Sequence, residues 1–362
     1  MRRHFDTSKD SEVKWHRSDK YASITGTEKV IKTEKEENIS EGPGHPCSTS
    51  TVYADSSHNS SIPLSPLCTV ITHDRDVIKF IPDLLAQVPN MPFFQHDDVK
   101  IFYTSDGNGP PVVLLHGWAC DSHDWSFQIP FLLSLNLRVI AVDHRGHGCS
   151  STPSTSDKYR PQTLAEDIVA LIQHLETGPV ILIAHSMSTI IASIIAVEYP
   201  DVVNALVLVH PIYGGAPPAL RVLGEDMQKE PERSAELGEE FFKKVMYTNQ
   251  TPEWLKTWSL RRVLGGDPAM LSGCIIGLTS TYGSIMGQSE ESKEYMRRRK
   301  GPRLAVCTLP AAPGWELDIG LGEGIDQVST LTEGTFSHMV QSEEFNKILG
   351  DWLRARNLLP QS

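Results

Sequence analysis

The sequence predicts an α/β protein: a doubly wound, mostly parallel sheet interrupted by a helical insertion. Short, continuously apolar segments alternate with helical patterns over residues 92–213, and the alternation returns after residue 303. Continuous apolar runs are typical of strands buried on both faces of a parallel sheet. Strands that alternate with helices imply right-handed βαβ units. We therefore expect one core from residues 92–213 and 303–358, with residues 214–302 as a helical lid.

Length and composition limit the classes of protein that fit. The 362 residues, 40% of them hydrophobic, suffice for one α/β core and an appendage. The net charge of −12 argues against nucleic acid as a partner. The six cysteines show no CxxC pair or ligand-like spacing, which predicts neither disulfides nor a metal site. With no long apolar run and no apolar leader, the sequence predicts a cytoplasmic protein without a membrane span.

The N-terminal quarter of the chain differs from the rest. Residues 1–65 are polar and charged with few apolar clusters, so burial cannot offset the entropy of ordering them. We expect a disordered extension, either a regulatory tail or an inert leader. Residues 66–91 contain an apolar pattern that Pro82 interrupts, which predicts a linker or a short helix.

The first half of the core is predicted to consist of strands, each followed by a turn or loop. A helix follows with capping-box spacing at residues 163–166 and apolar residues at helical intervals up to Leu175. The strand at 99–104 is followed by a turn at 106–111, and the strand at 112–115 by a loop at 116–125. The strand at 138–143 is followed by a loop at 143–148.

The segment 179–200 changes periodicity abruptly around Ser186. Residues 180–183 are apolar without alternation, as in a buried strand, and residues from Met187 to Pro200 are apolar over about three helical turns. A serine at so short a strand-to-helix junction lies on a tight, strained turn, and the first amides of the helix point to the same place. This geometry is that of an activated nucleophile beside an oxyanion site. The alternative is that Ser186 only caps the helix.

After the strand predicted at 202–209, the alternation stops until residue 303. Charged helical segments at 239–246 and 253–260 predict the helical insertion, and the basic run 297–303 is interpreted as a solvated helix end. Strands are then predicted at 304–309 and 327–331. The chain ends in a predicted helix with Ser342 as N-cap, whose apolar residues follow helical spacing: Phe345, Ile348, Leu349, Trp352 and Leu353.

Four motifs in order resemble the α/β-hydrolase superfamily over about residues 92–356: His116-Gly-Trp118, Asp143-x-Arg-Gly-x-Gly148, the Ala184-His-Ser-Met-Ser188 turn, and Gly334-Thr-Phe-Ser-His338. The loop at 116–125 looks most like hydrolases of fungal secondary-metabolite clusters and, more distantly, like cofactor-free quinaldine dioxygenases. The superfamily usually has glycine where Ala184 and Ser188 stand, but both residues are small enough for the turn.

The resemblance implies roles for four residues. Ser186 is the expected nucleophile, and the amides of Met187 and Trp118 are the expected oxyanion donors. His338 follows the last predicted strand and is the expected general base, because serine needs a base at neutral pH. The alternative for His338 is a surface loop histidine.

The third member of the triad departs from the superfamily pattern. An acid usually follows the strand at 304–309, but residues 310–315 contain no carboxylate. A minority of the superfamily places the acid after the preceding strand, where this chain has His210. Glu316 is therefore our first choice and Asp318 our second. The remaining possibility is that no acid orients His338.

The sequence thus predicts a serine hydrolase that cleaves an ester, lactone or thioester of a medium-sized apolar molecule, with secondary metabolism as the expected setting. We expect a small-molecule substrate and neither cofactor nor metal. Epoxide hydrolases of this superfamily use Asp where Ser186 stands, which disfavours their chemistry. The alternatives are a cofactor-free oxygenase or lyase that uses His338 as base, and a catalytically weakened binding protein. The substrate and the oligomeric state remain open.

Overall fold

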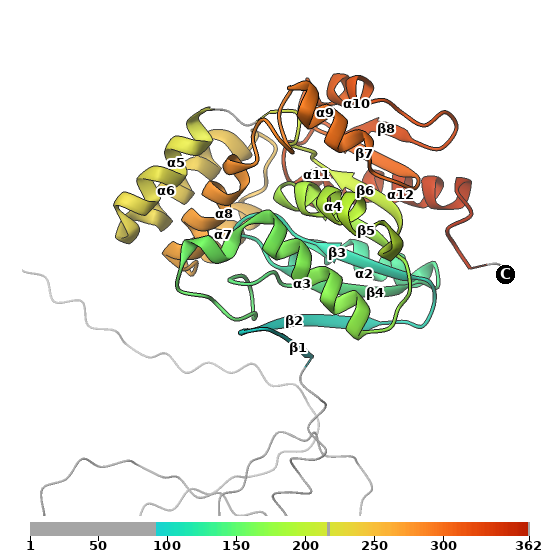
Figure 1. The fold of residues 1–362 in the computed structure, drawn as a ribbon, viewed down its shortest axis with the longest axis horizontal. Coiled ribbons are helices and arrows are strands. Elements are labelled where there is room, and N and C mark those ends of the chain that lie inside the picture. Colours follow the sequence, from blue (N-terminus) through green and yellow to red (C-terminus); the bar gives the residue numbers. More distant parts are fainter. Residues whose placement is uncertain (1–91, 216–217, 361–362) are drawn as a thin grey trace, which may run out of the picture. The chain divides into compact units, whose positions relative to one another are not determined.

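The computed structural model describes residues 92–215 and 218–360, which lie in one compact unit (Figure 1). The predictions for residues 1–65 and 66–91 lie outside the described residues. Within the described part, no single helix is long and apolar enough to cross a membrane, although two helices that meet at 102°, Glu253–Leu264 and Pro268–Ser280, together satisfy the length and composition required.

In the described residues the core is one eight-stranded sheet with strand order β1-β2-β4-β3-β5-β6-β7-β8. The first two strands pair antiparallel, β2 also runs antiparallel to β4, and all later pairs are parallel. The predicted α/β class and mostly parallel sheet are confirmed, whereas β1 was not predicted. The strands are β1 (Phe93–His96), β2 (Val99–Asp106), β3 (Pro111–Leu115), β4 (Arg138–Val142), β5 (Val180–His185), β6 (Val203–Val209), β7 (Arg303–Cys307) and β8 (Gln327–Thr330).

Helices cover both faces of the sheet, so its central strands are apolar over most of their length. Successive residues of β3 show the alternation: Val113 and Leu115 belong to one hydrophobic cluster, and Val112 and Leu114 to the other. The first cluster includes residues of α3 (Pro161–His174) and α4 (Met187–Glu198), and the second includes residues of α2 (Gln128–Ser134) and α12 (Ser342–Ala355). This two-sided burial explains the continuous apolar runs in the sequence.

Two predicted helix starts were wrong in detail. The helix α3 begins at Pro161 with Arg160 as its N-cap, so Thr163 lies inside the helix. Proline suits the first helical position because its missing N–H has no partner there in any case. The helix α12 begins at Ser342 itself, and Gln341 is the N-cap.

Between β6 and β7 the chain forms a series of helices, which we call the helical insertion. Its members α5, α6, α7 and α8 lie together beyond one end of the sheet, whereas α9 packs on α10 (Ala312–Ile319) beside β7 and β8 (Figure 1). The bounds are α5 (Pro218–Lys229), η5 (Pro231–Arg233), α6 (Ser234–Phe241), the π-helical η6 (Phe242–Met246), α7 (Glu253–Leu264), α8 (Pro268–Ser280) and α9 (Glu290–Arg297).

The basic run at 297–303 is not a solvated helix end throughout. Arg299 and Arg303 are buried, with 8% and 5% of their surfaces exposed. Arg303 can be buried because the carboxylates of Glu316 and Asp326 lie 3.2 and 3.0 Å from its guanidinium nitrogens. The interpretation of this run was therefore wrong for its two buried arginines.

Candidate active site

Ser186 lies between the last residue of β5, His185, and the first residue of α4, Met187. Its backbone has φ 51° and ψ −114°, in the left-handed region that an L-residue rarely adopts. The turn is held on both sides, because the Ser186 amide donates to the Val209 carbonyl at 2.9 Å and the Thr189 amide donates to the Ser186 carbonyl at 2.9 Å. A held, strained serine at a strand-to-helix junction is the geometry of a nucleophile elbow.

Ser188 stands where the superfamily usually has glycine, and its hydroxyl has a structural use. The hydroxyl donates a hydrogen bond to the carbonyl oxygen of His116 and lies 2.8 Å from His144 Nε2. His116 follows β3 and His144 follows β4. The extra side chain therefore connects the elbow to the loop after β3, the strand beside β5, and to the loop after β4, one strand further along the sheet.

The loop after β3 lies directly against the elbow. A Cβ atom on Gly117 would come within 3.3 Å of Ser186 Cβ, so only glycine fits there without displacing the elbow. The next residue, Trp118, is buried, and its indole Nε1 donates to the Leu271 carbonyl of α8 at 3.1 Å. Met187 opens α4, and the first amides of a helix have no partner within the helix. The proposed oxyanion donors thus belong to two segments that adjoin Ser186.

His338 is fully buried in the short helix α11 (Ser337–Val340). Its ring packs between those of His185 and Trp125, with centroid distances of 4.4 and 4.9 Å. Gln128 Nε2 donates to its backbone carbonyl at 2.9 Å. Within the described residues neither ring nitrogen of His338 has a hydrogen-bond partner, so no hydrogen bond joins it to Ser186.

The surroundings of His338 favour its neutral form. Burial lowers its pKa well below the ordinary value, and the neighbouring His185 and His210 lower it further. At neutral pH the imidazole therefore keeps a free lone pair, as a general base requires.

The structure does not bring Glu316 to His338. Glu316 is fully buried on α10, where its Oε2 lies 3.2 Å from Arg303 Nε and 3.9 Å from Arg299 Nη2. Arg303 is the first residue of β7, at the amino end of that strand. Ser186 follows the carboxyl end of β5, so Glu316 contacts the opposite end of the parallel sheet. Burial raises the pKa of Glu316 to about 8, with the neighbouring Asp326 contributing. The guanidinium groups of Arg303 and Arg299 act in the opposite direction, because a nearby positive charge favours the carboxylate form.

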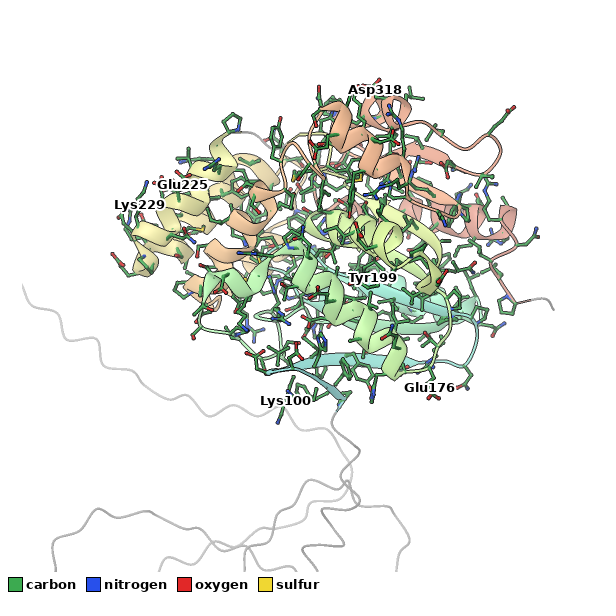
Figure 2. All side chains as sticks on the ribbon, viewed as in Figure 1. Lys100, Glu176, Tyr199, Glu225, Lys229 and Asp318 are labelled. Carbon is green, nitrogen blue, oxygen red and sulfur yellow. The ribbon has the colours of Figure 1, made fainter. Side chains whose placement is uncertain are left out.

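Asp318 is no better placed. Its side chain is 62% exposed and lies 3.7 Å from Lys293 Nζ, and Figure 2 shows it on the outer side of α10. Among the described residues, neither Glu316 nor Asp318 pairs with His338. Both residues were chosen as the acid from chain order alone. Both choices were wrong, because neither carboxylate lies beside the His338 ring.

Neutral residues follow β7 and β6, the two strands after which the superfamily places the acid. Thr308 follows β7, and His210 follows β6 with a left-handed φ of 52°. Their side chains bond to each other, from His210 Nδ1 to Thr308 Oγ1. Burial lowers the pKa of His210 to about 3, with His185 contributing, so the pair carries no charge at neutral pH.

A buried carboxylate that the sequence analysis did not select lies on the loop after β3. Asp124 belongs to the short helix η2 (Ser122–Trp125) and is fully buried. Its Oδ1 lies 2.5 Å from Nη1 of Arg262, which also lies 3.0 Å from Asp121 Oδ1. Since Arg262 belongs to α7, this ion-pair group connects the helical insertion to the loop that carries Trp118 and Trp125. The only sequence signal was a carboxylate next to a tryptophan in that loop.

A cavity of about 760 Å³ lies between this loop, the loop after β4 and α7. Its lining includes Cys120, Asp121, His147, Trp258 and Arg262.

Comparisons with known proteins agree with this architecture. A family model described as the alpha/beta hydrolase fold matches residues 110–254. The crystal structure of an enol-lactonase from Burkholderia xenovorans has a TM-score of 0.61 at 18% identity, covering 73% of this chain and 100% of that one. The chain has the α/β-hydrolase fold. An esterase from Thermogutta terrifontis shares this fold, with a TM-score of 0.61 at 20% identity and coverage of 74% and 98%. The predicted α/β-hydrolase fold is thereby confirmed.

Curated relatives match shorter stretches of this α/β-hydrolase-fold chain. An epoxide hydrolase of Neurospora crassa is 34% identical over 130 residues, which are 35% of this chain and 37% of that protein. A non-heme chloroperoxidase of Kitasatospora aureofaciens is 43% identical over 91 residues, 25% of this chain and 32% of that protein. The matched stretches thus span only about a third of the length of each relative.

Proposed function

We propose that this chain is a serine hydrolase that cleaves an ester, lactone or thioester of a medium-sized, mostly apolar molecule. The observation that carries the proposal is the strained backbone of Ser186 at the junction of β5 and α4. A serine in this conformation presents its hydroxyl at the carboxyl edge of the sheet, next to the first amide of a helix.

The reaction follows from the groups around Ser186. The Ser186 oxygen bonds to the substrate carbonyl carbon while His338 accepts the hydroxyl proton. The amides of Met187 and Trp118 stabilise the resulting oxyanion. His338 then returns the proton to the leaving oxygen or sulfur as the bond to it breaks. A water molecule, deprotonated by His338, releases the acyl group and restores Ser186.

In this proposal, packing rather than a carboxylate orients His338. The rings of Trp125 and His185 lie against its ring, and Gln128 holds its backbone. Loss of the acid in a serine triad typically reduces turnover by about 10⁴-fold. We therefore expect a slow hydrolase, with rates well below those of an enzyme that has a complete triad.

Apolar side chains near the elbow support an apolar substrate. Trp118 packs on Phe242 at a ring distance of 5.8 Å, and Phe242 packs on Phe336 at 6.1 Å. Phe242 belongs to the helical insertion, so we infer that α5–α8 act as a lid over the substrate. Two proteins with the same fold are called esterase and enol-lactonase, which fits carbonyl substrates of these classes.

Hydrolysis of para-nitrophenyl esters of increasing acyl length tests this function. We expect slow turnover that prefers medium-length acyl chains and is lost in Ser186→Ala. The variant Asp318→Asn, altered at an exposed position, should keep the wild-type rate. Equal rates for wild type, Ser186→Ala and His338→Ala would contradict the proposal and favour binding without catalysis.

The lack of a carboxylate partner for His338 favours one second candidate, a cofactor-free oxygenase or lyase. In that reaction His338 removes a substrate proton and Ser186 is not a nucleophile. Oxygen consumption with a hydroxyquinoline or phenolic substrate, retained in Ser186→Ala and lost in His338→Ala, would identify it. Oxygen consumption that Ser186→Ala abolishes would exclude it.

A further inference from the structure

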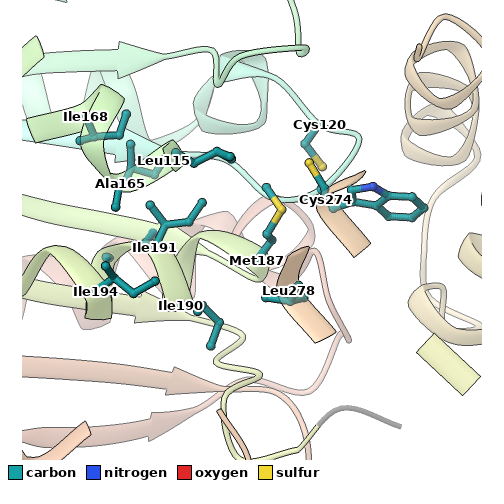
Figure 3. Close-up of a cluster of buried hydrophobic side chains, with 14 of the residues drawn as sticks. Leu115, Cys120, Ala165, Ile168, Met187, Ile190, Ile191, Ile194, Cys274 and Leu278 are labelled. Carbon is teal, nitrogen blue, oxygen red and sulfur yellow. The ribbon is translucent and has the colours of Figure 1, made fainter. Parts of the chain in front are cut away.

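Three side chains with metal-binding atoms meet behind the elbow: Cys120, Asp124 and His185. All three are buried, and their ligand atoms lie within 4.8 Å of one another. Two belong to the loop after β3, and the third precedes Ser186 at the end of β5. Figure 3 shows Cys120 near Met187 and Cys274, in the interior beside the start of α4.

Two of these side chains have free acceptor atoms. Asp124 Oδ2 and His185 Nδ1 are buried and have no hydrogen-bond partner within the described residues. His185 Nε2 lies 2.8 Å from the Thr335 carbonyl oxygen, so Nε2 carries the proton and Nδ1 the lone pair. The Nδ1 atom faces the loop after β3, because a Cβ on Gly117 would lie 3.0 Å from it. Buried acceptors without a donor are costly, and a cation between them removes that cost.

The remaining atoms of both side chains are held as those of metal ligands usually are. Ligating histidines generally donate their other ring N–H to a carbonyl or carboxylate, and ligating carboxylates are themselves hydrogen-bonded. Here His185 Nε2 donates to Thr335, and Arg262 Nη1 holds Asp124 Oδ1. Each side chain therefore keeps one atom free and directed to the cluster.

The charges of the group also favour a divalent cation. Asp121 and Asp124 together carry two negative charges, and Arg262 supplies one positive charge. A divalent cation that displaces the Cys120 proton adds two positive charges and one negative charge. The buried group would then be neutral, which reduces the cost of burying it.

We propose that Cys120, Asp124 and His185 bind one zinc ion, which fastens the loop after β3 to the nucleophile elbow. Thiolate, imidazole and carboxylate are the ligands that zinc prefers, and three protein ligands with one open position form a common zinc geometry. Tetrahedral zinc needs ligand atoms about 3.5 Å apart, so small side-chain rotations suffice. Cys120 lines the 760 Å³ cavity, which gives the ion and a fourth, water ligand a path.

Zinc binding is independent of the proposed hydrolysis and is measured without a substrate. The full chain is stripped with a chelator, incubated with zinc, dialysed and analysed for metal by mass spectrometry. We expect one zinc per chain, and a loss of at least tenfold in affinity in Cys120→Ser and Asp124→Asn. The control is Cys149→Ser, since Cys149 lines the same cavity but is exposed and outside the cluster. A wild-type chain without bound zinc, or zinc unaffected by Cys120→Ser, would overturn the site.

Cobalt provides a measurement on the wild-type chain in case the ligand variants do not fold. Cobalt(II) in this site should give a thiolate-to-metal charge-transfer band and intense tetrahedral absorption, both displaced by zinc. Because the Cys120 thiol must lose its proton, affinity should increase with pH. Cobalt absorption without a thiolate band would also reject the proposal.

Discussion

At Ser186 the backbone adopts φ 51° and ψ −114°, a conformation that costs an L-residue about 1–3 kcal/mol. The fold maintains it through the Val209 carbonyl on one side and the Thr189 amide on the other. Strain held by its surroundings is characteristic of functional positions. At this residue, stability and the proposed activity therefore require different side chains.

Ser186→Gly should be more stable than Ser186→Ala by about 1 kcal/mol, because glycine adopts positive φ without strain. Both variants remove the hydroxyl, so both should be inactive on esters. Chemical denaturation compares their unfolding free energies. An alanine variant as stable as the glycine variant would show that the turn is not strained.

The pH profile of ester hydrolysis depends on His338. The base must be unprotonated, and burial with His185 and His210 nearby lowers its pKa well below the ordinary 6.5. The acid limb of kcat/KM should therefore fall below pH 6.5, since the imidazole stays neutral where an exposed histidine would be protonated. An acid limb at or above pH 6.5 would mean that His338 is not the buried, neutral base described.

At the scale of elements, the two ends of β7 make different contacts. Its amino end carries Arg303, which pairs with Glu316 of α10 and with Asp326 before β8. Its carboxyl end leads to Thr308, which bonds to His210 near the elbow. A residue can follow β7 closely in sequence and still lie at its far end, because α10 runs back along the sheet.

Glu316→Gln should lower stability without a specific effect on catalysis. It removes the carboxylate beside the buried Arg299 and leaves Arg303 with Asp326 alone, and breaking a buried ion pair costs about 3–5 kcal/mol. Thermal unfolding measures the loss, with the exposed Asp318→Asn as the control. A stable Glu316→Gln variant whose kcat falls about 10⁴-fold would restore Glu316 as the acid of the triad.

For the whole molecule, the sequence analysis worked best where local pattern decides structure. Continuous apolar runs identified the central strands, and the change of period at Ser186 located the elbow. The choice of Glu316 or Asp318 as the acid failed, because the order of residues along the chain does not say at which end of β7 a following residue packs. The cluster of Cys120, Asp124 and His185 was not predicted for a similar reason. The pairing of β3 with β5 brings together residues that are far apart in the chain.

Stability should decline as the pH falls below about 6.5, because six histidines of the described residues are buried in neutral form. Burial lowers their pKa values in the folded state, whereas the unfolded chain titrates near 6.5, so it binds more protons below that pH. Each histidine can remove up to about 1.4 kcal/mol per pH unit, down to its folded-state pKa. Urea denaturation between pH 7 and 5 measures the slope, and a flat profile would contradict the buried, neutral state. The six are His116, His144, His147, His185, His210 and His338.

The most direct test of the central claim is labelling with a fluorophosphonate probe, followed by peptide mass spectrometry. The account predicts one adduct, on Ser186, that is absent in Ser186→Ala and slowed by about 10³-fold or more in His338→Ala. Circular dichroism establishes that each variant is folded. A folded wild-type chain that stays unlabelled, or one labelled at another residue, would contradict the assignment of Ser186 as the nucleophile.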